Sequence, residues 1–88
     1  MYRLEFTDGA KKDLVKLHKK APMAIKKLNA LLTEIQEHPT TGTGQVEQLK
    51  YYEEETWSRR INNEHRLVYR IQEDVVVVLV LSVYGHYK

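Results

Sequence analysis

The sequence predicts an α+β domain in two layers, with an N-terminal strand and a helical hairpin packed on a mostly antiparallel sheet of about four strands. Residues 10–35 carry apolar side chains at helical spacing, and residues 56–84 form strand-like runs separated by turn residues. Strands that follow one another directly are typical of antiparallel pairing. Because the chain has 88 residues, we expect one domain, spanning residues 1–88, with a single core.

The first predicted element is a short strand over residues 2–6, where apolar and polar side chains alternate. Thr7 or Asp8 then offers a side-chain oxygen that suits the N-terminus of a helix. Apolar residues recur at helical spacing over 10–17, with lysines between them. This pattern predicts an amphipathic helix that ends near Lys20.

A second helix is predicted to have Pro22 in its first turn, because a proline there loses no hydrogen bond. Its apolar stripe runs over residues 25–35 and continues to about Glu37, and Pro39 then ends the helix. Glycines and threonines dominate residues 39–46, which predicts a loop.

Three strand-like runs remain in the C-terminal half. Residues 56–61 and 65–71 are separated by a polar turn at 62–64, where asparagines tolerate a left-handed conformation. A second polar turn at 72–74 leads into residues 75–84, which are apolar on both faces, as in a central strand. We therefore expect a meander of three or four strands.

The length of the first hairpin loop decides which arginines lie together. A two-residue loop at 62–63 would pair Arg59 with Arg66, whereas a loop that includes Glu64 would pair Arg60 with Arg66. The pattern leaves both registers open. In either case two guanidinium groups lie opposite each other, which is unfavourable unless an anion bridges them. The alternative is that these arginines pair with the carboxylates of residues 53–55.

Composition restricts the class of protein. The net charge is only +2, but residues 10–27 hold seven lysines against Asp13 alone, and such a stretch suits either a solvated helix face or phosphates and acidic partners. The absence of cysteine excludes a disulfide scaffold and fits a reducing cytoplasm. The longest apolar run, Val75 to Leu81, is too short to span a membrane, and the N-terminus has no apolar signal segment. A soluble intracellular protein is expected.

The C-terminal half also carries the groups needed to cleave RNA without a metal. A carboxylate can remove the proton of a 2′-hydroxyl, guanidinium groups can hold the phosphate, and an imidazolium can protonate the leaving 5′-oxygen. No histidine–carboxylate spacing suits a metal site. The candidate residues are Glu47, Lys50, Arg59, Arg60, Arg66, His86 and Tyr87.

A lone histidine is usually structural or incidental, so its position in the fold must show whether it is a catalytic candidate. His86 directly follows the predicted central strand, where a scaffold presents functional groups, and an ordinary pKa near about 6.5 suits an acid. By contrast, His18, His38 and His65 are expected to be structural or incidental. Glu47, taken alone, would be an ordinary surface glutamate.

Four segments together resemble a known family. Trp-Ser-Arg-Arg-Ile at 57–61, Glu-His-Arg-Leu-Val-Tyr at 64–69, the His-Tyr at 86–87 and the G-x-G-x-x-E-x-L-K pattern at 42–50 resemble the YoeB (Txe) toxins of the RelE/ParE superfamily. The resemblance covers essentially the whole chain. It implies a two-layer RelE-like fold and a bacterial, cytoplasmic toxin of a toxin–antitoxin pair.

The same resemblance implies an endoribonuclease that cleaves mRNA in the ribosomal A site, leaving a 2′,3′-cyclic phosphate and a 5′-hydroxyl. Glu47 matches the general base, Arg66 the phosphate-stabilising arginine, His86 the general acid and Tyr87 the terminal tyrosine of the site. Lys50, Arg59 and Arg60 match positive groups near the phosphate. No metal or cofactor is implied; the implied partners are a YefM/Phd-type antitoxin, the ribosome with its mRNA and, as in some relatives, a second copy.

The chain departs from the family pattern at Tyr51, where relatives often carry histidine, at the acidic residues 53–55, and at Gly85, where relatives often carry tyrosine. Two other functions therefore stay open. One is a ParE-like toxin that binds DNA gyrase without nuclease activity, because one fold hosts both activities. The other is an inactive module that only pairs with an antitoxin.

Overall fold

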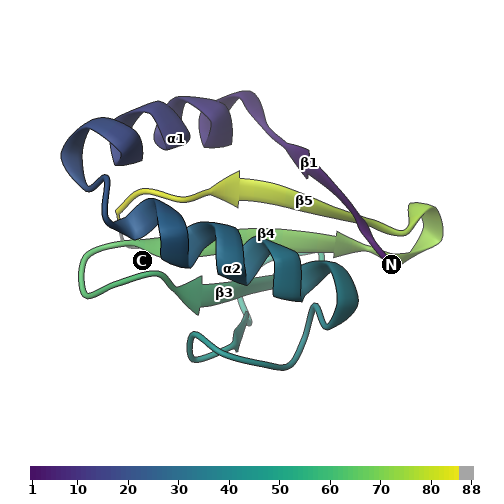
Figure 1. The fold of residues 1–88 in the computed structure, drawn as a ribbon. Coiled ribbons are helices and arrows are strands. Elements are labelled where there is room, and N and C mark those ends of the chain that lie inside the picture. Colours follow the sequence, from purple (N-terminus) through teal and green to yellow (C-terminus); the bar gives the residue numbers. More distant parts are fainter. Residues whose placement is uncertain (86–88) are drawn as a thin grey trace.

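The computed structural model describes residues 1–85, which form two helices on one face of a five-stranded sheet (Figure 1). The predicted two-layer α+β fold is confirmed. The sheet has five strands where about four were expected, because three residues after the glycine loop pair with its edge. In chain order the elements are β1 (Arg3–Phe6), α1 (Asp8–Lys20), α2 (Ala24–Glu37), β2 (Glu47–Leu49), β3 (Thr56–Arg60), β4 (Arg66–Gln72), a 3-10 turn (Glu73–Val75) and β5 (Val77–Ser82).

The sheet order is β1-β5-β4-β3-β2. β1 runs parallel to β5, and the other neighbouring pairs are antiparallel. The apolar run at 75–84 therefore does supply an inner strand, β5, flanked by β1 and β4. Figure 1 shows both helices crossing the same side of this sheet.

The helices begin and end where local chemistry dictates, with one difference. Thr7 caps α1, since its side-chain oxygen accepts a hydrogen bond from the Ala10 N–H at 3.0 Å. Pro22, expected in the first turn of α2, instead lies in a turn before it, where its carbonyl accepts from the Ile25 N–H at 3.3 Å. α2 starts at Ala24.

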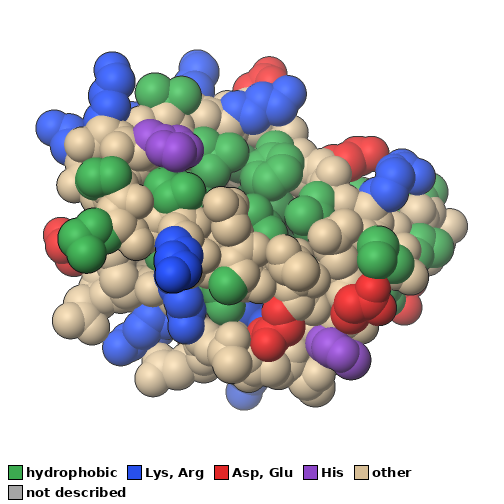
Figure 2. Space-filling model, in the orientation of Figure 1, with side chains coloured by type: hydrophobic (Ala, Val, Ile, Leu, Met, Phe, Trp, Pro, Cys, Tyr) green, Lys and Arg blue, Asp and Glu red, His purple; other side chains and the backbone are tan. Residues whose placement is uncertain are grey.

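The core lies between the helices and the sheet face that they cover. Leu28, Leu31 and Ile35 of α2 are almost fully buried, as are Leu67 and Tyr69 of β4. The lysines at residues 11–27 are all exposed, and Figure 2 shows positive side chains around the α1 end of this face. Among residues 1–85, neither helix is long and apolar enough to cross a membrane.

The opposite side of the sheet, here called the distal face, is turned away from the helices. Side chains alternate along a strand, so residues beside Leu67 and Tyr69 in β4 point to this face. Cross-strand pairing then adds their partners on β3 and, beyond β3, on β2. The polar residues that β2, β3 and the first five residues of β4 place on the distal face are Glu47, Thr56, Ser58, Arg60, Arg66 and Arg70.

Candidate active site

Two arginines lie side by side on the distal face. Arg60 of β3 is paired directly with Arg66 of β4, and the Ile61 N–H donates to the His65 carbonyl at 3.0 Å. The hairpin therefore has the three-residue loop 62–64, which resolves the register that the sequence left open. Directly opposed residues have Cβ atoms about 4.5–5.5 Å apart, so these two positive charges share one small area.

Glu47 reaches the same face from the edge of the sheet. It opens β2, is exposed, and is paired with Ser58 of β3. Because neighbouring strands are about 4.8 Å apart, Glu47 lies about 10 Å across the sheet from the strand that carries Arg66.

Lys50 is exposed in the turn directly after β2, next to the fully exposed Tyr51. The adjoining segment forms an open hollow of about 400 Å³, whose lining includes Lys50, Tyr52 and Glu53. Glu54 in this segment makes an ion pair with Arg70 at 3.0 Å. The alternative, in which an arginine pairs with a carboxylate of residues 53–55, therefore holds for Arg70, toward the opposite end of β4 from Arg66.

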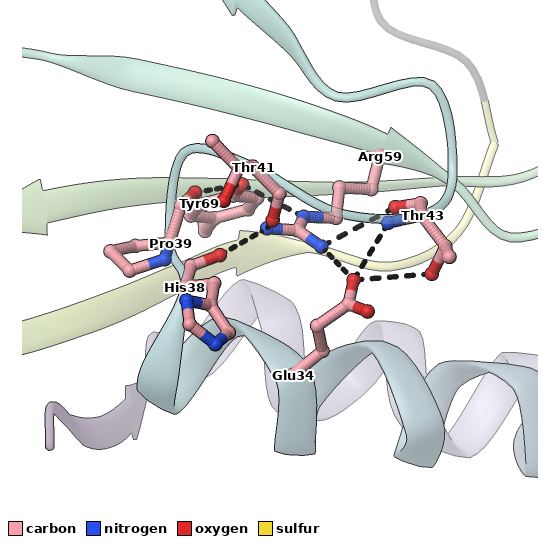
Figure 3. Close-up of polar contacts among 7 residues, drawn as sticks. All are labelled: Glu34, His38, Pro39, Thr41, Thr43, Arg59 and Tyr69. Atoms are coloured by element: carbon pink, nitrogen blue, oxygen red, sulfur yellow. Dashed lines mark hydrogen bonds and ion pairs between the residues drawn. The ribbon is translucent and has the colours of Figure 1, made fainter.

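Arg59 occupies a different environment, although it adjoins Arg60 in sequence. Its side chain points to the helix-covered face and is fully buried. Figure 3 shows the guanidinium surrounded by α2 and the loop that follows it. Its nitrogens donate to Tyr69 Oη at 3.1 Å, Glu34 Oε1 at 2.5 Å, and the carbonyls of His38, Thr41 and Thr43 at 2.6, 2.8 and 3.3 Å.

This arrangement differs from the phosphate-binding role expected for Arg59. A guanidinium has five N–H donors, and here each of its nitrogens donates to the chain itself. Arg59 therefore has no exposed group with which to hold a substrate. The reason is the register of the hairpin, which pairs Arg60 with Arg66 and turns Arg59 to the opposite face of the sheet. Arg59 acts as an internal brace for the loop between α2 and β2.

Two partners of Arg59, Glu34 and Tyr69, have shifted pKa values that favour these hydrogen bonds. The backbone N–H of Thr43 is the main group that lowers the pKa of Glu34, and Arg59 adds to the effect, so this carboxyl stays ionised beside the guanidinium. Burial raises the pKa of Tyr69. Its phenol keeps its proton and donates it to the Pro39 carbonyl at 2.6 Å.

The glycines of the G-x-G segment are needed for this close approach. Gly42 has φ +126°, and a Cβ atom there would lie 2.3 Å from Glu34 Oε1. Gly44 has φ +90°, and a Cβ there would lie 3.2 Å from both Arg59 Cβ and the Arg60 carbonyl oxygen. Only glycine accepts both constraints, so the motif reflects backbone packing next to the Arg59 brace.

His65, expected to be structural or incidental, is structural. Its side chain is buried and its Nδ1 accepts a hydrogen bond from the Gly85 N–H at 2.8 Å. The available signal was its place in the motif beside Arg66. His86 and Tyr87, the expected acid and its neighbour, lie outside the described residues. Of the expected site, the structure thus brings Glu47, Arg60 and Arg66 to one face, with Lys50 at its edge, and separates Arg59 from them.

Comparisons with known proteins agree with this fold over nearly its whole length. A family model described as the YoeB-like toxin of bacterial type II toxin–antitoxin systems matches residues 6–87. The curated Toxin YoeB of Synechocystis sp. is 35% identical over 86 residues, covering 98% of each chain.

Two solved structures from Staphylococcus aureus are also similar. A YoeB dimer is 32% identical, with a TM-score of 0.84 and 98% of each chain covered. A YoeB–YefM complex is 32% identical, with a TM-score of 0.80 and 99% of each chain covered.

Proposed function

This chain belongs to the YoeB-like toxins of bacterial type II toxin–antitoxin systems, and on that premise we propose that it is a ribosome-dependent endoribonuclease that cleaves mRNA in the A site. The observation that carries the proposal is the distal face, where Arg60 lies opposite Arg66 and Glu47 projects from the next strand. Opposed guanidinium groups repel each other, so an anion placed between them is favoured. A carboxylate beside a phosphate-binding pair is the arrangement that 2′-hydroxyl attack requires.

The proposed reaction needs two proton transfers and no cofactor. Glu47 takes the proton of the ribose 2′-hydroxyl, and the 2′-oxygen then bonds to the adjacent phosphorus. The bond from phosphorus to the 5′-oxygen breaks, and His86 protonates that oxygen. The products are a 2′,3′-cyclic phosphate and a 5′-hydroxyl.

The positive groups stabilise the charge that develops on the phosphoryl oxygens. Arg66 and Arg60 approach the phosphate from neighbouring strands, and the exposed Lys50 adds a positive charge at the edge. Tyr87 is assigned to the site by its match with the family motif. Arg59 is left out of this set because its guanidinium is buried.

The proposed partners are the ribosome with its mRNA and a YefM-like antitoxin. The solved YoeB–YefM complex of S. aureus, which shares 32% identity with this chain, supports the second of these. A cationic site suits an acidic segment that folds over it, and such a segment can be removed by proteolysis. The S. aureus YoeB dimer makes self-association a further expectation.

The test is cleavage of mRNA on programmed ribosomes by the wild type and by Glu47→Gln, Arg66→Ala and His86→Gln. Loss of a general acid or base should slow cleavage by about 10²–10⁴-fold. Loss of the phosphate-binding guanidinium should slow it by about 10²–10³-fold. Primer extension would map the cut, and end-group analysis should find the cyclic phosphate.

Two matched variants control for general effects of charge. Glu64→Gln changes an exposed loop carboxylate, and Arg70→Ala changes the arginine of β4 that pairs with Glu54. Both should cleave at nearly the wild-type rate. If the wild type stops growth yet leaves ribosome-bound mRNA intact, the nuclease assignment is wrong, and inhibition of purified DNA gyrase would then favour the ParE-like alternative.

A further inference from the structure

The chain is tied down at three successive residues just before the proposed general acid. The Val83 N–H donates to Asp13 Oδ2 of α1 at 3.2 Å. The Tyr84 ring stacks on the His65 ring, with centroids 4.4 Å apart. The Gly85 N–H donates to His65 Nδ1 at 2.8 Å, and the Gly85 carbonyl accepts from the Arg66 N–H at 3.0 Å.

His65 is itself held in a fixed place. It directly precedes β4, and its backbone N–H donates to Asn62 Oδ1 at 2.8 Å. Its carbonyl accepts from the Ile61 N–H, and only 6% of the residue is exposed. A buried ring with a fixed backbone and a stacked neighbour is a rigid support, unlike an incidental surface histidine.

The contact with Gly85 also fixes the chemical state of the ring. A backbone N–H can only donate, so Nδ1 must present its lone pair, and the imidazole is then neutral with its proton on Nε2. Gly85 has φ +81°, and nothing lies within 4 Å of the position of a Cβ. The glycine thus serves the turn of the chain, and the two hydrogen bonds hold that turn.

We propose that His65 is a positioning residue, which holds Gly85 against the backbone of Arg66, directly before the proposed acid His86 in sequence. The proposal rests on the nuclease function proposed above. One dipeptide then carries out both tasks, because the backbone and imidazole of residues 65–66 bind Gly85 while the Arg66 side chain lies on the distal face. The chain is therefore fixed beside Arg66 as far as the residue that immediately precedes the proposed acid in sequence.

Two substitutions separate the acceptor from the ring. His65→Asn keeps an acceptor atom bonded to Cγ, where Nδ1 is, and loses the ring. His65→Phe keeps an aromatic ring for Tyr84 and loses the acceptor. A displacement of about 1 Å at a reacting group can cost 10²-fold, so we expect His65→Phe to lower the saturating single-turnover cleavage rate by about 10- to 100-fold.

The comparison has a defined outcome for each variant. The toxin concentration that gives half-maximal rate should stay within about twofold of wild type, since the phosphate-binding arginines are untouched. His65→Asn should retain most of the rate. Equal activity of His65→Phe and the wild type would overturn the positioning role, and so would equal losses in both variants.

Measurements on the wild type keep the test independent of whether a variant folds. Nitrogen-15 spectra should show His65 with Nδ1 unprotonated and Nε2 protonated, and the Gly85 amide should be protected from hydrogen exchange. A proton on Nδ1, or free exchange at Gly85, would contradict the contact itself. If the wild type cleaves no mRNA, the nuclease function fails while these two signals still decide whether His65 holds Gly85.

Discussion

Arg59 and Arg60 are adjacent in sequence, yet the alternation of β3 sends them to opposite faces. Arg59 enters the interior, where Glu34 and three backbone carbonyls surround it, and Arg60 lies opposite Arg66 on the distal face. A charge removed from water must be paired and fully hydrogen-bonded to be tolerated, and Arg59 meets that condition. The same residue type therefore serves stability at one position and, on our proposal, phosphate binding at the next.

Replacing Arg59 should destabilise the fold. Arg59→Ala leaves the Glu34 carboxylate and the carbonyls of the following loop without their donor. Breaking a buried pair on one side costs about 3–5 kcal/mol, and because the Glu34 side chain is 30% exposed, the loss should lie near the lower end of that range. Small domains have only about 5–15 kcal/mol of stability, so a large share of it should be lost. Urea denaturation would measure the change in the free energy of unfolding.

Two further variants sharpen this comparison. Arg59→Lys keeps the charge but not the planar fork, so it should recover only part of the loss. Arg60→Ala should change the free energy of unfolding by less than about 1 kcal/mol while it slows cleavage. Equal stability losses in Arg59→Ala and Arg60→Ala would show that the buried network is not what stabilises the loop.

Most elements could be predicted from sequence because their signals are local. The Thr7 cap and the helical spacing after it define α1, and the apolar run at 75–84 identifies β5. β2 was not predicted, since Glu47–Leu49 is only three residues long and is defined by its pairing with β3. Which face of the sheet Arg59 occupies relative to Arg66 depends on the length of the hairpin loop, which the sequence left open. The structural role of His65 depends on Gly85, a partner twenty residues away in sequence.

The connection from α2 to β2 is the element whose placement depends most on side chains. Glu34 of α2 accepts from the Thr43 N–H at 2.8 Å, from Thr43 Oγ1 at 3.1 Å and from Arg59, so one carboxylate joins a helix, a loop and a strand. Glu47 begins β2 three residues beyond this loop's Gly44. The loop that precedes the proposed base is therefore held to α2 and β3 through Glu34.

The fold should lose stability on acidification through this carboxylate. The folded-state pKa of Glu34 lies below its ordinary value of 4.5, chiefly because of the Thr43 N–H. A lowered pKa contributes stability that is fully present above pH 4.5 and is lost as the pH falls through the folded-state value. Denaturation of wild type and Glu34→Gln between pH 6 and about 3 should show a steeper acid loss in the wild type. Parallel curves would exclude this contribution.

At the scale of the whole molecule, the two faces of the sheet have separate tasks. The helices and the apolar core occupy one face, and the charged residues of the proposed site occupy the other. Substitutions on the distal face can therefore change activity without opening the core. The cost of this arrangement is that two like charges, Arg60 and Arg66, lie directly opposite each other on β3 and β4.

That cost predicts that a bound anion stabilises the whole molecule. Inorganic phosphate between Arg60 and Arg66 binds only the folded state, and at ten times its Kd it adds about 1.4 kcal/mol to the free energy of unfolding. For a domain of this size each kcal/mol raises Tm by about 4–8 °C, so the shift is easily measured by calorimetry against chloride at equal ionic strength. Arg70→Ala should keep the shift, because Arg70 is paired with Glu54. The double variant Arg60→Ala/Arg66→Ala should lose it; an undiminished shift there would place the anion elsewhere, with the exposed lysines of residues 11–27 as the next site to test.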